Sequence, residues 1–295
     1  MMMIFGVPLA AFTGQLMLGL INGAFYALLS LGLAVIFGLL KIVNFAHGAM
    51  YMLGAFATLL GMQYLGINYW VSLILVPLVV GGFGMLIERF ILRRISHLDH
   101  LYGLLLTFGL ALIFEGTLVN FFGVSGLRYP TPELLQGGYN LGFMFLPIYR
   151  GWVLLAALVV CLGTWFIIER TRLGAYLRAG TENSALMQAF GVNVPLLITL
   201  TYGFGVALAA FAGVLAAPLY PVSPTMGSSL LIVVFAVVVI GGMGSILGSI
   251  ITGLAMGLIE GLTKVYYPEA ANTVIFLVMI LVLMLRPAGL FGKEA

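Results

Sequence analysis

Long stretches of this chain contain no charged side chain. Residues 1–40, 42–87 and 183–259 include no Asp, Glu, Lys or Arg. About 20 consecutive apolar residues make a helix long enough to cross the hydrocarbon core of a bilayer, so the third stretch alone has room for three membrane spans. Only 7% of the residues are charged, whereas soluble domains contain about 25%. The sequence therefore predicts an integral membrane protein.

The pattern inside these stretches favours α-helices over a membrane β-barrel. Barrel strands alternate apolar and polar residues over about 10 positions, but runs such as LLIVVFAVVVIGG at 230–242 do not alternate. We therefore expect an all-α polytopic membrane protein with about 8–10 transmembrane helices. The predicted spans are 12–38, 44–64, 69–91, 101–122, 151–168, 194–219, 228–244, 247–263 and 271–286. The first two could form a bent hairpin, and the pair at 228–263 could be partly re-entrant.

Basic residues indicate how the spans are oriented. Cytoplasmic loops of membrane proteins are enriched in Lys and Arg. Of the 12 Lys and Arg residues, only Arg128, Arg150 and Lys264 fall on one side of the predicted spans. The other side is then cytoplasmic, which places the N-terminus outside and the C-terminus in the cytoplasm. We expect residues 1–295 to form a single transmembrane domain.

Two predicted loops are longer than simple turns. The outer loop, at about 123–150, contains Pro130, Pro132, Pro147 and several glycines, which favour a folded-over surface loop. The inner loop, at about 169–193, is the most polar segment of the chain.

The inner loop contains the signals of a short amphipathic helix at 181–190. Thr181 is a suitable N-cap and Glu182 complements the positive helix end. The remaining signals are Gly180 before the helix, Leu186, Met187 and Phe190 on one face, and Gly191 at its end. A helix of this length is unstable alone in water. It therefore packs on its own membrane domain, lies at the lipid interface, or docks into a groove on a cytoplasmic partner.

Two predicted helices carry small residues at every fourth position. One row comprises Ser245, Ser249, Gly253, Gly257 and Gly261, and the other comprises Gly205, Ala209, Gly213 and Ala217. This spacing places each row on one helix face, where small side chains let two backbones approach closely. We expect internal helix packing, and a subunit interface is the alternative.

Polar residues at membrane depth are candidates for function because burying them is costly. The pathway or gate candidates are Asn22, Asn44, His47, Gly48 and Glu115. The spacing of three places Asn44 and His47 on the same helix side as Lys41, near the cytoplasmic end. Lipid offers their polar groups no partner, so they either bond neighbouring helices or line an inner gate.

Two glutamates in the predicted spans have different surroundings in the sequence. Glu115 has no charged neighbour, and it could pair with Arg128, bond another helix or face an aqueous path. Glu260 is four residues before Lys264, a spacing at which opposite charges pair along a helix. We therefore expect Glu260 to have a structural role.

The sequence carries no motif for an enzyme or for its own ATP hydrolysis. A G-x-x-x-x-G-K-[ST] loop, an H-E-x-x-H zinc motif and a G-x-S-x-G nucleophile elbow are all absent from the sequence. The three histidines are dispersed, so no metal or other cofactor is expected. A net charge of +3 gives no reason to expect nucleic-acid binding.

Three stretches of the chain resemble the branched-chain amino-acid ABC importer permeases of the LivH type. They are NGAFYALLSLGLAVIFGLLKIVNFAHGAMYMLGAF from Asn22, RTRLGAYLRAGTENSALMQAFGVNV from Arg170, and VVVIGGMGSILGSIITGL from Val237. The resemblance runs in register from about Ile21 to Phe291. It implies a type II-like importer permease in a prokaryotic plasma membrane that carries branched-chain or related hydrophobic amino acids.

The resemblance also implies partners. These are a second permease of the LivM type, two cytoplasmic ATP-binding subunits that hydrolyse ATP, and an extracytoplasmic binding protein that delivers the substrate. The helix at 181–190 would then be the coupling helix that contacts an ATP-binding subunit. Relatives often have an acidic stretch where this chain has Thr181 to Ser184. Transport of urea or short amides, or action as a stand-alone channel or ion-coupled carrier, are the alternatives.

Overall fold

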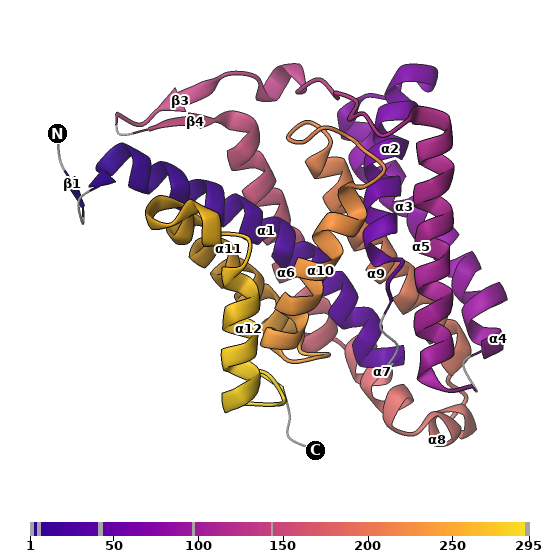
Figure 1. Cartoon of the computed structure of the whole chain (residues 1–295). Coiled ribbons are helices and arrows are strands. Elements are labelled where there is room, and N and C mark those ends of the chain that lie inside the picture. Colours follow the sequence, from indigo (N-terminus) through magenta and orange to yellow (C-terminus); the bar gives the residue numbers. More distant parts are fainter. Residues whose placement is uncertain (1–2, 5–6, 41–43, 96–97, 143, 293–295) are drawn as a thin grey trace. The chain divides into compact units, whose positions relative to one another are not determined.

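The structure of the protein is a computed structural model (Figure 1) that describes residues 3–4, 7–40, 44–95, 98–142 and 144–292. A helix occupies each of the nine segments predicted as spans. Within the described residues, six helices are long and apolar enough to cross a membrane, and Met226–Gly241 and Val274–Leu285 are shorter apolar helices. The prediction of an all-α polytopic membrane fold is confirmed.

The chain forms two compact units. The first comprises Met1–Ser30, Pro130–Cys161 and Val233–Ala295, and the second comprises Leu31–Tyr129 and Leu162–Ile232. Three helices run from one unit into the other, namely α1 (Leu9–Leu40), α6 (Ile148–Arg170) and α10 (Met226–Gly241).

The second unit contains most of the remaining helices. They are α2 (His47–Leu65), α3 (Tyr69–Ile87), the π-helix η1 (Glu88–Leu92), α4 (Arg93–Ile95), α5 (His100–Phe122), α7 (Arg172–Glu182), α8 (Ser184–Ala189) and α9 (Val194–Ala216). At the centre of this unit, α9 packs along both α2 and α3. A helix with neighbours on two sides has little lipid contact, and α9 is accordingly buried along much of its length.

Glycines let α9 approach its neighbours at backbone distance. A Cβ added to Gly213 would lie 2.2 Å from the carbonyl oxygen of Tyr51 in α2. A Cβ on Gly205 would lie 2.8 Å from the carbonyl oxygen of Gly32 in α1. Both carbonyls belong to the backbone, which cannot move aside as a flexible side chain can. The backbones of α1 and α2 therefore occupy the space next to the small residues of α9, within the same chain.

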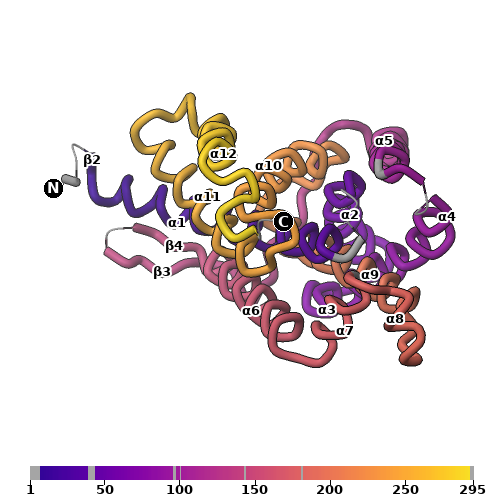
Figure 2. The backbone as a smooth tube through the Cα atoms, turned by 90° about the horizontal axis from the view of Figure 1, so that it is seen from below, coloured from indigo at the N-terminus to yellow at the C-terminus, as the bar shows by residue number. Residues whose placement is uncertain are grey.

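The first unit is built around α1 and α11 (Ile246–Tyr266), which lie side by side in Figures 1 and 2. A Cβ on Gly253 would lie 2.4 Å from the backbone nitrogen of Ala27, and one on Gly257 would lie 2.3 Å from that of Gly23. Ser30 Oγ donates a hydrogen bond to the carbonyl oxygen of Ser249 at 3.1 Å. Gly261 faces α1 in the same way, with its Cβ position 2.6 Å from the carbonyl oxygen of Gln15.

The rest of the first unit is short. It contains α12 (Val274–Leu285), the 3-10 helices η2 (Glu133–Leu135) and η3 (Pro268–Ala270), and two antiparallel hairpins, β1 (Met3–Ile4) with β2 (Val7–Pro8) and β3 (Gly138–Asn140) with β4 (Phe145–Pro147). The hairpin β3–β4 belongs to the loop predicted at 123–150, so this loop folds on itself as its prolines and glycines suggest.

The helix that follows the first span begins later than predicted. We expected it to start near Asn44, but α2 begins at His47. The reason is local, because the side chain of Asn44 accepts a hydrogen bond from the backbone N–H of Ala46 at 3.1 Å. Asn often closes such a turn through its own side chain and so competes with the helix.

Candidate functional site

The polar residues of the second unit gather along α9. Two groups lie on successive turns of this helix. We call them the Asn44 cluster, which comprises Asn44, His47, Thr107 and Tyr202, and the Glu88 clamp, which comprises Glu88, Arg93, Thr199 and the carbonyl of Pro195. Thr199 and Tyr202 are three residues apart, which corresponds to about 4.5 Å along a helix axis.

The Asn44 cluster joins the start of α2 to α5 and α9. Asn44 Nδ2 donates a hydrogen bond to the hydroxyl oxygen of Tyr202 at 3.1 Å. The backbone N–H of Phe45 donates to Thr107 Oγ1 at 3.1 Å. All four members of the cluster are buried, and these two hydrogen bonds give Asn44 Nδ2 and the N–H of Phe45 the partners that a hydrocarbon environment does not offer.

His47 and Gly48 extend this junction to α1 and α10. A Cβ on Gly32 of α1 would lie 2.9 Å from Cε1 of His47, so the imidazole packs directly on α1. A Cβ on Gly48 would lie 2.5 Å from the carbonyl oxygen of Gly227 in α10. The structure thus brings together three of the predicted gate residues, Asn44, His47 and Gly48. Lys41, which shares their spacing, lies outside the described residues.

The Glu88 clamp ties α3 to the first turns of α9. Glu88 is 3% exposed and opens the π-helix η1. Its Oε2 accepts a hydrogen bond from Thr199 Oγ1 at 2.5 Å and lies 3.4 Å from Arg93 Nη2. Arg93 Nη2 also donates to Thr199 Oγ1 at 2.7 Å and to the carbonyl oxygen of Pro195 at 2.8 Å. A buried carboxylate needs such partners, and π-helical turns are frequent at functional sites.

Sequence reasoning did not find the clamp. Glu88 lies inside a predicted span, five residues before Arg93. The short separation of these opposite charges was the feature of the sequence that could have predicted their ion pair. A carboxylate at the end of an uncharged stretch of more than forty residues needs a partner. Thr199 and Tyr202, in contrast, carry no signal of their own in a helix that is otherwise apolar.

The helix predicted at 181–190 differs from its prediction. We expected one helix at 181–190 capped by Thr181, with Glu182 in its first turn. Instead, α7 extends to Glu182 and α8 starts at Ser184, so Thr181 and Glu182 lie in the last turn of α7. The cap of α8 is Asn183, whose side chain accepts a hydrogen bond from the N–H of Leu186 at 2.9 Å. Asn is at least as good an N-cap as Thr, and here it separates the two helices.

α8 presents apolar side chains that the described part of the chain does not cover. Leu186 is 52% exposed and Phe190 is 75% exposed, and Met187 is half-buried. Gly191 follows with φ +83°, a conformation that suits a helix end. The exposed face is the kind that docks into a groove on another protein.

α8 is joined directly to the Glu88 clamp. Asn193 caps α9 by accepting a hydrogen bond from the N–H of Leu196 at 3.1 Å. Pro195, whose carbonyl binds Arg93, lies in the first turn of α9. Only residues 190–193 separate α8 from the end of α9 that carries the clamp.

Short contacts hold α7 against its neighbours. Gly180 packs on Val194 at the start of α9, with its Cβ position 3.7 Å from that side chain. Arg178 Nη1 donates to the carbonyl oxygen of Ile168 in α6 at 2.8 Å and lies 3.5 Å from the carboxylate of Glu169. α7 thus lies between the end of α6 and the start of α9.

Two other candidates lie away from α9. Glu115 is half-buried on α5, and Leu112 and Ile113, which precede it in the same helix, are exposed. Within the described residues, no ion pair joins it to Arg128.

Asn22 belongs to the first unit, where its Nδ2 donates to Glu260 Oε1 at 3.3 Å. The hydroxyl of Tyr26 donates to Glu260 Oε2 at 2.6 Å. The predicted pair of Glu260 and Lys264 is confirmed. Glu260 is therefore surrounded by Asn22 and Tyr26 from α1 and by Lys264 from its own helix.

The hydrogen bonds and the ion pair of the site join one helix to another. Glu88, Thr199 and Arg93 bond to one another, as do Asn44 and Tyr202, and all of these except Arg93 are buried. In the part of the chain that the structure describes, no group of three or more His, Cys, Asp or Glu side chains could hold a metal ion. The arrangement connects the exposed helix α8 to helices at the centre of the second unit.

Comparisons with known proteins define the class of this membrane protein. The family described as branched-chain amino acid transport system / permease component matches residues 15–284. The chain therefore belongs to this family, and it is a multi-pass membrane protein. No solved structure gives a significant match.

Individual relatives are similar over 90% or more of this chain. The permease protein BraD of a high-affinity branched-chain amino acid transport system from Pseudomonas aeruginosa is 30% identical over 95% of both chains. The corresponding LivH of Escherichia coli is 28% identical over 96% of both chains. LivM of Escherichia coli, named as a permease protein of the same kind of system, is 28% identical over 90% of this chain and 67% of its own.

Proposed function

We propose that this protein is a permease subunit of an ATP-binding-cassette importer and forms part of the membrane pathway for branched-chain amino acids. The observation that carries this proposal is the match to BraD over 95% of both chains. Named relatives of two types, LivH and LivM, favour this substrate class over urea or short amides. They also favour a transporter subunit over a stand-alone channel or carrier.

The proposal includes three kinds of partner. A second permease completes the pathway, and the similarity to LivM as well as to LivH supports a pair of related permeases. Two cytoplasmic ATP-binding subunits supply energy, because this sequence has no P-loop. An extracytoplasmic binding protein delivers the amino acid. The assembly lies in a prokaryotic plasma membrane, with the C-terminus of this chain in the cytoplasm.

The mechanism follows from the path along α9. The exposed side chains of Leu186 and Phe190 on α8 dock on an ATP-binding subunit. When ATP binding moves that subunit, α8 pulls on the first turn of α9 through residues 191–195. The Glu88 clamp makes α3 follow α9. Small shifts of packed helices of this kind are a common form of conformational switching.

The Asn44 cluster is the proposed gate. Tyr202 lies one turn beyond the clamp on α9 and holds Asn44 at the start of α2. A shift of α9 therefore acts on the turn at Asn44 and on His47, which packs against α1. These residues act by fixing the helices around the pathway, and the binding protein supplies most of the selectivity. Glu115, half-buried on α5, is the proposed polar group that faces the pathway.

Reconstitution tests the function. Proteoliposomes that contain this chain, the second permease and the ATP-binding subunits are given the binding protein outside and ATP inside, and uptake of radiolabelled leucine is measured. We expect uptake only with ATP and with all partners present. Liposomes with this chain alone are the control. Leucine flux through the chain alone would refute an importer subunit, and ATP-driven uptake of urea without uptake of leucine would refute the substrate class.

A further inference from the structure

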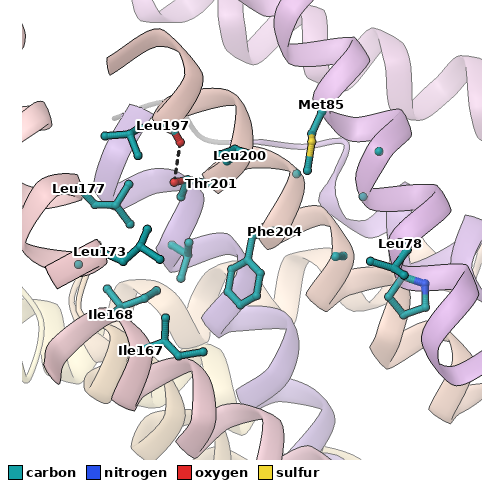
Figure 3. A pocket seen from close by; sticks show the side chains of 17 residues that line it. Leu78, Met85, Ile167, Ile168, Leu173, Leu177, Leu197, Leu200, Thr201 and Phe204 are labelled. Carbon is teal, nitrogen blue, oxygen red and sulfur yellow. Dashed lines mark hydrogen bonds between the residues drawn. The ribbon is translucent and has the colours of Figure 1, made fainter. Parts of the chain in front are cut away.

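The second unit contains an apolar cavity of about 410 Å³. Figure 3 shows its walls, with Leu78 and Met85 of α3 on one side, Leu173 and Leu177 of α7 on the other, and side chains of α9 between them. The end of α6, through Ile167 and Ile168, and Val35 of α1 complete the wall. This volume lies within the range of small-molecule sites, about 300–1,000 Å³.

The lining excludes the transported amino acid as the occupant. Among the described residues that line the cavity, Thr201 has the one polar side chain. Its hydroxyl already donates to the carbonyl oxygen of Leu197 at 2.8 Å, drawn as a dashed line in Figure 3. The ammonium and carboxylate groups of an amino acid would enter without partners, which costs several kcal/mol. The part of the ligand that the cavity encloses is therefore a hydrocarbon group.

The exposed part of the lining identifies that hydrocarbon as lipid. Leu78, Leu173 and Leu200 line the cavity and are also exposed on the surface of the protein. The apolar surface of a transmembrane helix faces acyl chains, because the bilayer core contains no water. An acyl chain from the surrounding bilayer reaches this cavity without crossing a polar surface.

The charges next to the cavity determine the headgroup. Arg172 is exposed and directly precedes Leu173 in α7, and Arg170 lies over the ring of Trp165 at 5.7 Å. Trp is enriched at the membrane interface, and basic pockets between transmembrane helices bind the headgroups of anionic lipids. α7 itself has Arg172 and Arg178 with exposed Leu173 and Tyr176, a composition typical of helices in the plane of the interface.

We propose that this cavity binds one acyl chain of an anionic phospholipid whose phosphate lies against Arg172. The bound chain contacts α3, α6, α7 and α9 at once, so it fastens α7 to the helices that carry the Glu88 clamp. This makes the lipid a structural ligand of the segment that transmits movement. The inference does not depend on which substrate the protein transports.

The structure supplies a variant that fills the cavity. Gly82 lines it, and a Cβ added there would have no atom within 4 Å. Gly82→Leu therefore adds a side chain at the cavity wall without a clash at its Cβ. Gly163→Leu is the matched control, since Gly163 in α6 also has open space at its Cβ position but does not line the cavity. Arg172→Gln removes the phosphate contact, and Arg94→Gln removes another exposed arginine as its control.

Native mass spectrometry of the full chain in detergent measures the binding, with phosphatidylglycerol and phosphatidylcholine as competing probes. We expect one phosphatidylglycerol per chain. Gly82→Leu lowers its retention by more than about tenfold, because each buried CH₂ contributes about 0.8 kcal/mol. Arg172→Gln lowers the preference for phosphatidylglycerol by about fivefold, since one arginine near an anionic headgroup contributes about 1 kcal/mol. Gly163→Leu and Arg94→Gln behave as the parent protein.

Several results would overturn the proposal. One is retention by Gly82→Leu equal to that of the parent, and another is an equal loss in Gly163→Leu. A parent protein that holds both lipids equally would refute the role of Arg172. If the isolated chain retains the lipid but the complex assembled with its partners does not, a protein partner covers the cavity. Size-exclusion elution verifies that each variant is folded, and Arg172→Gln tests the site independently of Gly82→Leu.

Discussion

Two buried carboxylates in this protein have similar partners but different surroundings. Glu260 is bound by Asn22 and Tyr26 of α1 and by Lys264 of its own helix. Glu88 is bound by Thr199 of α9 and by Arg93 of its own helical segment. Each carboxylate thus joins two helices through one hydroxyl and one cation. The chemistry of the two sites is nearly the same.

The difference lies in what surrounds each site. Glu260 lies between α1 and α11, whose backbones touch along Gly253, Gly257 and Gly261. Glu88 instead opens a π-helix and faces the first turns of α9, next to the exposed helix α8. We infer that Glu260 fixes two helices that do not move against each other, whereas Glu88 transmits the movement of one helix to another.

Glu260→Ala is expected to have the largest effect on stability. It leaves Lys264 next to the space of the lost carboxylate and removes the acceptor of Tyr26. Breaking a buried pair by removing one partner costs about 3–5 kcal/mol. We expect a large drop in the midpoint of thermal unfolding in detergent, with transport per folded molecule unchanged. Glu269→Ala, at an exposed position in η3, is the control. A variant that is as stable as the parent but defective in transport would show that Glu260, like Glu88, transmits helix movement.

Glu88→Gln is expected to have a smaller effect on stability and a larger one on function. The amide retains a hydrogen bond to Thr199 but loses the charge that holds Arg93. Hydrogen bonds to charged groups contribute about 1.5–3 kcal/mol, so the loss of stability is about 2 kcal/mol. We expect ATP hydrolysis by the assembled complex to continue while uptake falls, because α3 no longer follows α9.

The control for Glu88→Gln is Arg89→Gln, which also removes one charge from η1, at an exposed position. Measurements of ATP hydrolysis and of leucine uptake on the same proteoliposomes separate coupling from folding. If both activities fall in proportion to the amount of folded protein, Glu88 is structural like Glu260, and the proposed difference between the two carboxylates is wrong.

Tyr202→Phe is expected to cost about 1 kcal/mol, because it leaves the Nδ2 donor of Asn44 without its acceptor. The ring remains and no cavity forms. We expect a modest fall in thermal stability and a change in uptake rate at constant ATP hydrolysis, since the link between α9 and α2 is loosened. Tyr64→Phe, at an exposed position near the end of α2, is the control. An unchanged uptake rate would refute the proposal that the Asn44 cluster is the gate.

The sequence predicted the helices well because membrane helices are specified locally. An uncharged apolar stretch of sufficient length forms a helix in lipid whatever its neighbours are, and all nine segments did so. The rows of small residues that start at Gly205 and at Ser245 likewise mark faces where backbones approach. These features depend on residue type and spacing alone.

The partners of buried polar groups could not be predicted in the same way. The pair of Glu260 and Lys264 was predicted because both residues lie on one helix. The bonds from Asn44 to Tyr202 and from Glu88 to Thr199 join residues more than a hundred positions apart, and helix packing decides them. The start of α8 was mispredicted because Thr181 and Asn183 are both suitable caps, and the structure uses Asn183.

Leu186→Asp is expected to have the smallest effect on stability, because the side chain is exposed and contributes little to folding within this chain. It should nevertheless abolish uptake, since a charge in the centre of an apolar docking face cannot enter a groove on the ATP-binding subunit. Co-purification of that subunit measures docking directly. Gln188→Asp adds the same charge to the opposite side of α8 and should preserve both docking and uptake. If Leu186→Asp leaves docking and uptake intact, α8 is not the element on which the ATP-binding subunit acts, and the clamp at Glu88 would lose its source of movement.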